Sequence, residues 1–174
     1  SWVIGLSLES ALLRAVPKLT PALLPRFLER YRVHYLLRDP EIKLFDGTLE
    51  LLEALSARGV KLAVATGKSR VGLNRVLAAT GLAKRFDATR TADETFSKPH
   101  PAMLLQIMEE VDVAPEHVAM VGDTSHDLQM ANSAGVHGVG VAYGAHPSDE
   151  LQACAPQAVV HSMAQLQAWL LART

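Results

Sequence analysis

The chain has 174 residues and a formal net charge of −1, with 17 Lys and Arg interspersed among 18 Asp and Glu. This length allows one domain, or a core with a small insert, that buries a sizeable hydrophobic centre. The balanced charge excludes the basic surface that nucleic acid or an anionic membrane requires, so neither is expected as a partner. The single cysteine, Cys154, excludes an internal disulfide framework and favours a reducing cytoplasm. No apolar run approaches a membrane span, and the first residues show no signal-peptide pattern.

Residues 1–43 are predicted to form a partial helical cap. Apolar residues share one face of a helix over residues 7–16, which Pro17 ends. A second helix is predicted from Thr20-Pro21, where proline suits the first helical position, to Asp39-Pro40. The apolar stripes of this helical hairpin indicate packing against a core rather than a cofactor site.

Residues 44–174 alternate helices and strands. Buried strands are predicted over residues 61–65, 86–89, 118–121, 137–141 and 158–160, separated by helices that end at Gly59, Gly81 and Gly135. A last helix is predicted after Ser162 as its N-cap. This alternation predicts an α/β fold with a doubly wound, mostly parallel sheet.

Two carboxylates follow the apolar strand over residues 118–121. Gly122 ends the strand, Asp123 follows at once, and Ser125 is predicted to cap a helix whose first turn carries Asp127. No Lys or Arg is adjacent to either acid in the sequence. Hard oxygen ligands with room for water suit Mg²⁺, so the sequence predicts a magnesium site at Asp123 and Asp127. The alternative is a helix cap with a first-turn acid, both favoured by the helix dipole.

Three further residues are predicted to meet these acids at one sheet edge. Thr66 and Gly67 follow the strand over residues 61–65, and Lys98 precedes a helix after the next strand. In a parallel sheet, all of these loops emerge at the same edge. A hydroxyl group, backbone N–H groups and a lysine ammonium together can hold a phosphate group.

Two glycine-containing segments resemble nucleotide-binding motifs without meeting their requirements. Gly67-Lys68-Ser69 matches the end of a P-loop, but Leu62 occupies the place of its opening glycine. Gly138 and Gly140 lie within a strand near the C-terminus, with no βαβ unit of a dinucleotide fold built on them. Neither segment predicts a nucleotide-binding loop.

Residues 64–68, 97–101 and 121–127 resemble the second, third and fourth motifs of the haloacid dehalogenase-like hydrolases. The chain is most similar to their phosphoglycolate-phosphatase-like branch, from about residue 3 to the end. The resemblance implies a Mg²⁺-dependent phosphatase that acts on a small phosphorylated metabolite through an aspartyl-phosphate intermediate. It also implies that Thr66, Gly67 and Lys98 bind the phosphoryl group and that Asp123 and Asp127 hold Mg²⁺. The histidines within these motifs, His100 and His126, are interpreted as bystanders.

The first motif of that family, Asp-x-Asp-Gly-Thr, does not occur in the chain. Asp46-Gly47-Thr48 matches its end, but Leu44 occupies the nucleophile position, and Asp46 is interpreted as a helix N-cap. The nucleophile, the acid/base residue and the first core strand are therefore expected upstream of Ser1. That strand would lie between the strands that end at Thr66 and Asp123, so its absence predicts a gap there.

The gap leaves several hypotheses open. The chain is expected to be a monomer or a homodimer in which a partner strand fills the gap, and to be inactive by itself. A truncated homologue that only binds metal and phosphate is the alternative function. A phosphoacceptor receiver domain is disfavoured because its acids precede its Thr and Lys, whereas Thr66 and Lys98 precede Asp123 here. A metal-free dehalogenase is disfavoured because it gives the two acids no cation to bind.

Overall fold

The structure, a computed structural model, describes residues 6, 8–20, 22–37 and 43–174. The helices are α1 (Leu8–Ala15), α2 (Leu24–Leu37), α3 (Thr48–Ser56), α4 (Arg70–Ala79), α5 (Ala102–Val111), α6 (Ser125–Ala134), α7 (Ser148–Gln152) and α8 (Met163–Leu171), with a 3₁₀ turn, η1, at Pro115–His117. The strands are β1 (Ala63–Thr66), β2 (Ala88–Thr91), β3 (Ala119–Gly122), β4 (His137–Val141) and β5 (Ala158–Val160). The predicted α/β fold with parallel strands is confirmed.

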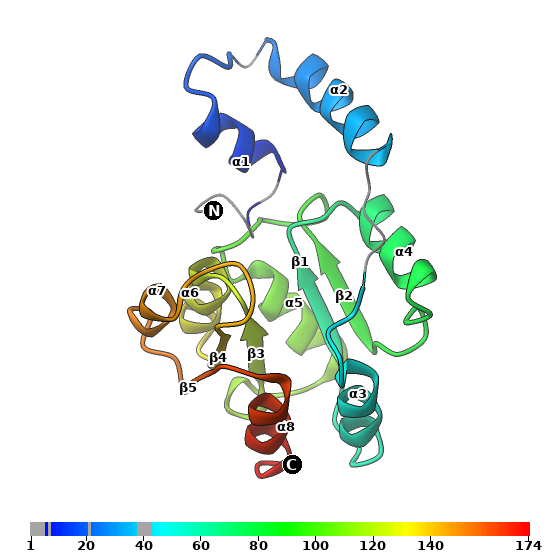
Figure 1. Ribbon diagram of the computed structural model, residues 1–174, viewed down its shortest axis with the longest axis vertical. Coiled ribbons are helices and arrows are strands. Elements are labelled where there is room, and N and C mark those ends of the chain that lie inside the picture. The colour runs from blue at the N-terminus through cyan, green and yellow to red at the C-terminus, as the bar shows by residue number, and fades with distance from the viewer. Residues whose placement is uncertain (1–5, 7, 21, 38–42) are drawn as a thin grey trace.

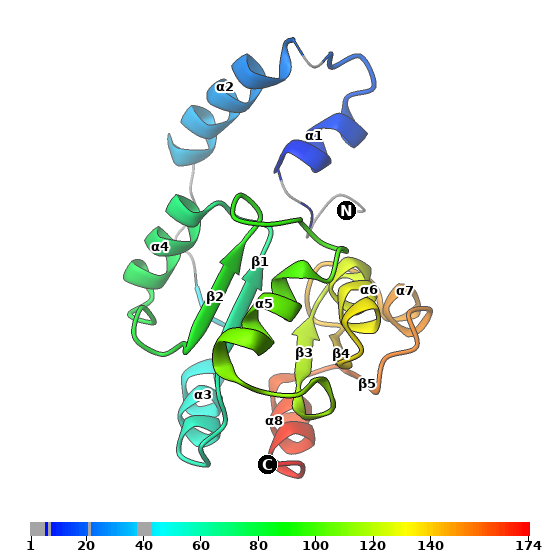
Figure 2. The ribbon, with the colours of Figure 1, turned by 180° about the vertical axis from the view of Figure 1, so that it is seen from behind.

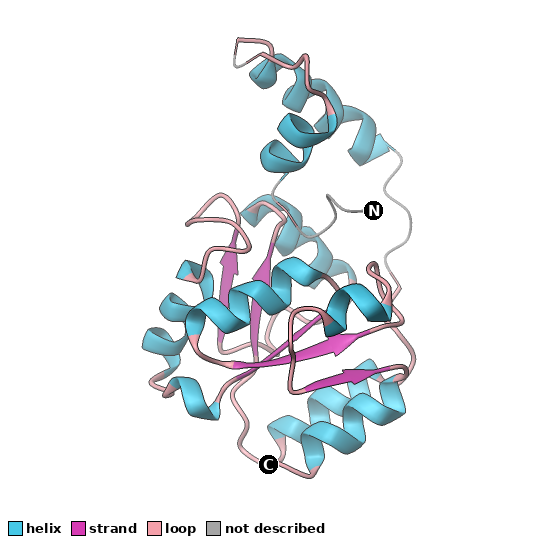
Figure 3. Ribbon diagram, turned by 90° about the vertical axis from the view of Figure 1, so that its left-hand side faces the viewer, coloured by secondary structure: helices cyan, strands magenta, loops and turns pink. Residues whose placement is uncertain are grey.

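The strands form two parallel ladders among the described residues, β1–β2 and β3–β4–β5. Ala63 pairs with Ala88 in the first ladder, and Ala119 pairs with His137 in the second. No described strand joins β1 to β3, so the two ladders separate where the sequence predicts a gap. Figure 3 shows the strands of the two ladders crossing at a wide angle.

Helices cover both faces of the strands (Figures 1 and 2). On one face, α5 and α6 pack against Ala65 of β1 and Met120 of β3. On the other, α3, α4 and α8 pack against the neighbouring residues Val64 and Val121. Because side chains alternate along a strand, adjacent apolar residues serve opposite layers. This double covering explains why the strands are continuous apolar runs.

Helices α1 and α2 lie together beyond the tips of β1 and β2, apart from the two ladders (Figure 1). The second helix begins at Leu24, after a turn in which Leu23 and Leu24 both donate to the carbonyl of Thr20. The predicted first helical position, Pro21, lies outside the described residues. Residue 7, the expected start of the first helix, and the expected end of the second at Asp39-Pro40 fall outside the described residues. The division into a cap (1–43) and a core (44–174) stays a prediction.

Two predicted helix caps are wrong. Gly47, not Asp46, caps α3, because a left-handed backbone conformation (φ 85°) turns the chain there and glycine adopts it without strain. Thr124, not Ser125, caps α6, because its hydroxyl accepts the N–H of Asp127. The predicted caps Ser162 and Gly135 are confirmed at α8 and α6.

The strand positions agree best in the second ladder. The predicted bounds 137–141 and 158–160 are those of β4 and β5, whereas β1 and β2 begin two residues later than predicted. Just before these two strands, Asp87 is bonded to Leu62 on both sides. Its N–H donates to Leu62 O (2.7 Å), and its carboxylate accepts the Leu62 N–H (2.8 Å). This Leu62 N–H bond, followed by the Lys61 side chain, lowers the pKa of Asp87. Helix α7, only five residues long, was not predicted.

Candidate phosphate and metal site

A buried turn places both acids after β3. Gly122 is buried, and a Cβ on it would lie 2.5 Å from Cγ of Asp127, so only glycine fits there. Thr124 and Asp127 form a capping box in which Thr124 N–H donates to Oδ2 of Asp127 (3.1 Å). The Thr124 hydroxyl donates to the same oxygen (2.8 Å). This box fixes the Asp127 carboxylate in one orientation.

The structure brings Lys98 and Asp127 into direct contact. The Lys98 ammonium donates to Oδ1 of Asp127 at 2.5 Å, and the two side chains are only 9% and 4% exposed. No Lys or Arg is adjacent to Asp127 in the sequence, but the fold supplies a cation from 29 residues away. Since the bond joins the loop after β2 to the first turn of α6, these two parts of the site are adjacent.

Asp123 lies against the loop that follows β4. Its Oδ2 accepts the N–H of Ala145 (3.0 Å), and its carbonyl accepts the N–H of His146 (3.0 Å). A Cβ on Gly144 would lie 2.5 Å from the same Oδ2, so the loop approaches the carboxylate closely because residue 144 has no side chain. Burial, and then the charge of Asp123, raises the pKa of Tyr143.

The donor set suits an oxygen-coordinated cation. Asp123 presents a carboxylate of which only Oδ2 is engaged within the described part of the chain, and Asp127 Oδ1 retains one lone pair beside Lys98. No third His, Cys, Asp or Glu joins them in a metal-holding group among the described residues. Because Mg²⁺ usually keeps several waters and needs few carboxylates, this set fits it.

Thr66 is the last residue of β1 and Gly67 follows it, at the end of the strand that faces α1 and α2 (Figure 2). The Thr66 hydroxyl accepts the N–H of Lys68 (3.2 Å), which folds the loop back on the strand end. No hydrogen bond joins Thr66 to Lys98 among the described residues. The structure therefore bonds Lys98 to Asp127, whereas Thr66 and Gly67 lie at the end of β1.

The two motif histidines lie at the margins of this site. His100 Nδ1 accepts the N–H of Ala102 (3.2 Å) at the start of α5, and its ring stacks on Phe96 with centroids 4.6 Å apart. The buried ring of His126 packs edge-on against His146, with centroids 5.9 Å apart. Their interpretation as bystanders stays a prediction.

Three structural features of the site were not predicted. The capping box has a visible signal, a threonine followed three residues later by an acid before an apolar run. The approach of Gly144 to Asp123 has no local signal, because the two residues belong to separate loops. The same holds for the ion pair between Arg70 and Glu94, which joins the loops after β1 and β2.

Comparison with known proteins decides the family. The model of the haloacid dehalogenase-like hydrolase family matches residues 1–141. The chain is a haloacid dehalogenase-like hydrolase. Within that family it is 37% identical over 169 residues to the "Probable phosphatase IndB" of Dickeya dadantii, covering 94% of this chain and 73% of the relative. The resemblance found in the sequence is thereby confirmed.

Other relatives carry more specific names. The chain is 35% identical to a "5'-nucleotidase" of Pseudomonas aeruginosa, over 81% of this chain and 63% of that protein. It is 32% identical to the "Phosphoglycolate phosphatase" of Escherichia coli K12, over 71% of this chain and 49% of that protein. The chain thus spans between about half and three quarters of these relatives.

A solved structure of similar fold is a "predicted phosphoglycolate phosphatase" from Haemophilus somnus. It superposes with a TM-score of 0.85 at 27% identity, covering 97% of this haloacid dehalogenase-like chain and 79% of that one. Among the described helices, none is both long and apolar enough to cross a membrane.

Proposed function

We propose that this haloacid dehalogenase-like hydrolase is a Mg²⁺-dependent phosphatase of small phosphate monoesters. In this proposal Thr66, Gly67 and Lys98 bind the phosphoryl group, and Asp123 and Asp127 bind Mg²⁺. An aspartate of an Asp-x-Asp-Gly-Thr segment attacks phosphorus and forms an aspartyl-phosphate, and no such segment occurs in these 174 residues. We therefore propose that this segment is supplied by residues other than these 174.

The buried ion pair between Lys98 and Asp127 is the observation that carries this proposal. A lysine on a carboxylate could be purely structural, but this pair joins the loop after β2 to the first turn of α6, four residues after Asp123. It therefore links the carboxyl ends of strands from the two ladders. Open α/β folds bind their ligands at this edge. The pair holds the Lys98 ammonium in a buried position at the site, which suits a group that must meet an anion.

The residues divide the chemistry between them. Lys98 directs its charge at phosphate oxygens, and the loop at Thr66 and Gly67 supplies a hydroxyl and backbone N–H donors. Asp123 and Asp127 hold Mg²⁺, which when bound neutralises phosphate charge. Thr124 orients Asp127 through the capping box, so that Asp127 faces Lys98. Positioning and charge neutralisation of this kind account for most catalysis of phosphoryl transfer.

The relatives favour two substrate classes, because they are named after phosphoglycolate and after nucleotides. We propose a phosphoglycolate-like small monoester, since the motifs resemble that branch most closely. Parallel assays with 2-phosphoglycolate and a nucleoside 5'-monophosphate separate the two classes.

Hydrolysis assays test the proposal. With Mg²⁺, the chain alone should hydrolyse neither p-nitrophenyl phosphate nor 2-phosphoglycolate, whereas a chain preceded by a strand bearing Asp-x-Asp-Gly-Thr should hydrolyse at least one. In the extended chain, Lys98→Ala should abolish turnover, and Lys61→Ala, at an exposed ion pair with Asp87, should not. Turnover by the chain alone that is lost in Asp46→Asn would show that Asp46 is the nucleophile.

A binding protein without turnover is the second candidate, because the chain lacks the nucleophile motif. Calorimetry separates binding from catalysis. Mg²⁺ should bind weakly and should bind less in Asp123→Asn, and tungstate, a phosphate mimic, should raise the melting temperature by mass action. An extended chain that binds both and hydrolyses nothing would favour the binder. Equal Mg²⁺ affinity in Asp123→Asn would contradict the metal assignment in either case.

A further inference from the structure

The proposed phosphate site is divided between two loops of the chain. The end of β1 and the loop after it contribute Thr66 and Gly67, and the loop after β2 contributes Lys98. A phosphate group held by both loops needs a fixed distance between them. Direct contacts between the two loops would fix that distance.

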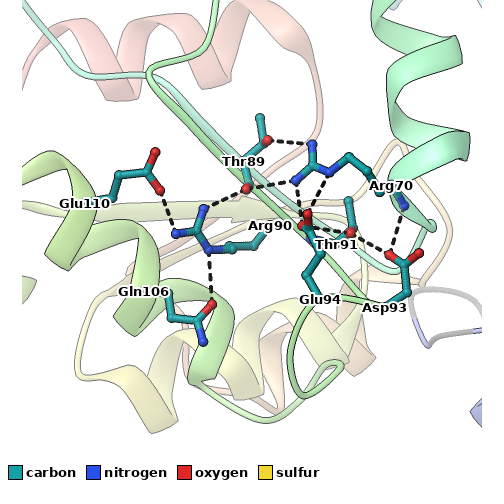
Figure 4. A network of polar contacts seen from close by, with 8 residues as sticks. All are labelled: Arg70, Thr89, Arg90, Thr91, Asp93, Glu94, Gln106 and Glu110. Atoms are coloured by element: carbon teal, nitrogen blue, oxygen red, sulfur yellow. Dashed lines mark hydrogen bonds and ion pairs between the residues drawn. The ribbon is translucent and has the colours of Figure 1, made fainter.

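Three contacts join the loops, and Figure 4 shows the two that Arg70 makes, with Asp93 and with Glu94. The N–H of Ala92 donates to the carbonyl of Lys68 (3.1 Å), and the N–H of Arg70 donates to the Asp93 carboxylate (2.9 Å). The Arg70 guanidinium donates to both carboxylate oxygens of Glu94, at 2.8 and 2.6 Å. This two-bond geometry fixes orientation as well as distance, since both groups are planar.

Glu94 is held on its second side by the end of β2. Its Oε2 accepts the N–H of Thr91 (3.0 Å) and lies 2.9 Å from the Thr91 hydroxyl, and Thr91 is fully buried. The bonds from Arg70, followed by those from Thr91, hold the pKa of Glu94 at about 2. Glu94 is thus an ionised link between the strand and Arg70.

The loop between Glu94 and Lys98 is fixed to α5. Gln106 donates to the Thr95 hydroxyl (3.1 Å) and accepts from Arg90 (3.1 Å), which also pairs with Glu110 (2.6 Å). Three residues after Thr95, Lys98 reaches the α6 side of the site. A displacement of Glu94 therefore moves a short, anchored loop, and Lys98 with it.

We propose that the Arg70–Glu94 ion pair is a positioning element of the phosphate site, which sets the distance between the loop of Thr66 and Gly67 and the loop of Lys98. This inference rests on the proposed function, because it assigns the ion pair to that same phosphate site. Arg70 and Glu94 act through the loops and are not catalytic residues.

Anion affinity measured on folded protein tests the proposal. The full chain is titrated with tungstate by calorimetry at a temperature where every variant is folded by circular dichroism. Glu94→Gln should weaken tungstate binding about ten-fold, because displacing a binding group by about 1 Å has large effects. Arg70→Lys, which keeps the charge but loses the second bond, should weaken it by a similar factor while melting close to the parent. The double variant should be no weaker than either single variant, because the two side chains act as one unit.

The matched control is Glu53→Gln, which removes an ion pair with Arg85 (2.7 Å) away from these loops. It should leave tungstate affinity unchanged. Affinity that is unchanged in both Glu94→Gln and Arg70→Lys would overturn the inference and leave the proposed function standing. Failure of the parent chain to bind tungstate would overturn both.

Discussion

The candidate site has two halves, one around β3 and one between β1 and β2, and different contacts hold each of them. Around β3, the backbone of Gly122 contacts Asp127, and the Lys98–Asp127 ion pair is 9% and 4% exposed. Between β1 and β2, the Arg70–Glu94 ion pair is 32% and 36% exposed. Steric exclusion and burial fix the first half, whereas the second depends on charges that water and salt can reach. The half with Asp127 and Lys98 is therefore the more rigid, and the half with Thr66 and Gly67 the more adjustable.

Gly122→Ala should show the largest difference between the halves. Its Cβ would overlap the Asp127 side chain within a buried turn, so we expect a loss of about 4 kcal/mol or more in the free energy of unfolding. The control is Gly72→Ala in α4, where the nearest atom to the new Cβ is Ser69 Oγ at 3.4 Å. That change should stabilise the protein by about 0.5 kcal/mol. Urea unfolding followed by circular dichroism measures both, and equal effects would contradict the packing argument.

Lys98→Met should show the next largest effect. It leaves the Asp127 carboxylate buried without its cation, which should lower the free energy of unfolding by about 3 kcal/mol. Adding Asp127→Asn should recover more than half of this loss, because it removes the uncompensated charge. By contrast, Glu94→Gln at the half-exposed pair should cost less than about 1 kcal/mol. A loss in Lys98→Met no larger than in Glu94→Gln, measured by urea unfolding, would contradict the proposed difference between the halves.

The smallest predicted effect is a pH dependence of the Arg70–Glu94 ion pair in the β1–β2 half. Hydrogen bonds from Arg70 hold the pKa of Glu94 at about 2, below its ordinary value of 4.5. A lowered pKa stabilises the folded state above pH 4.5, and this contribution is lost as the pH falls toward 2. The difference in melting temperature between the parent and Glu94→Gln should thus be constant near neutral pH, shrink below about pH 4.5 and decrease in high salt. A difference that grows on acidification would contradict the assignment.

Much of the fold follows from local sequence. The apolar runs at residues 137–141 and 158–160 have the bounds of β4 and β5, and Ser162 and Gly135 cap the helices predicted for them. These features depend on neighbouring residues: an apolar run must be buried, and a hydroxyl or a glycine at a helix end satisfies or redirects adjacent backbone. The motifs also identified the family correctly, as the match of the family model shows.

The tertiary structure alone decided which charges meet. Asp127 has no cation beside it in the sequence, yet Lys98 binds it across 29 residues, and Arg70 reaches Glu94 across 24. Aspartate is a residue type favoured at N-caps, but α3 is capped by Gly47 and not by Asp46, because the backbone turns at Gly47. The gap between the two ladders was expected from the family resemblance, whereas the pairing within each ladder depends on which strands lie side by side. Local sequence therefore specified the helices, the strands and the candidate residues. Contacts between loops that are far apart in the sequence determined which of those residues pair.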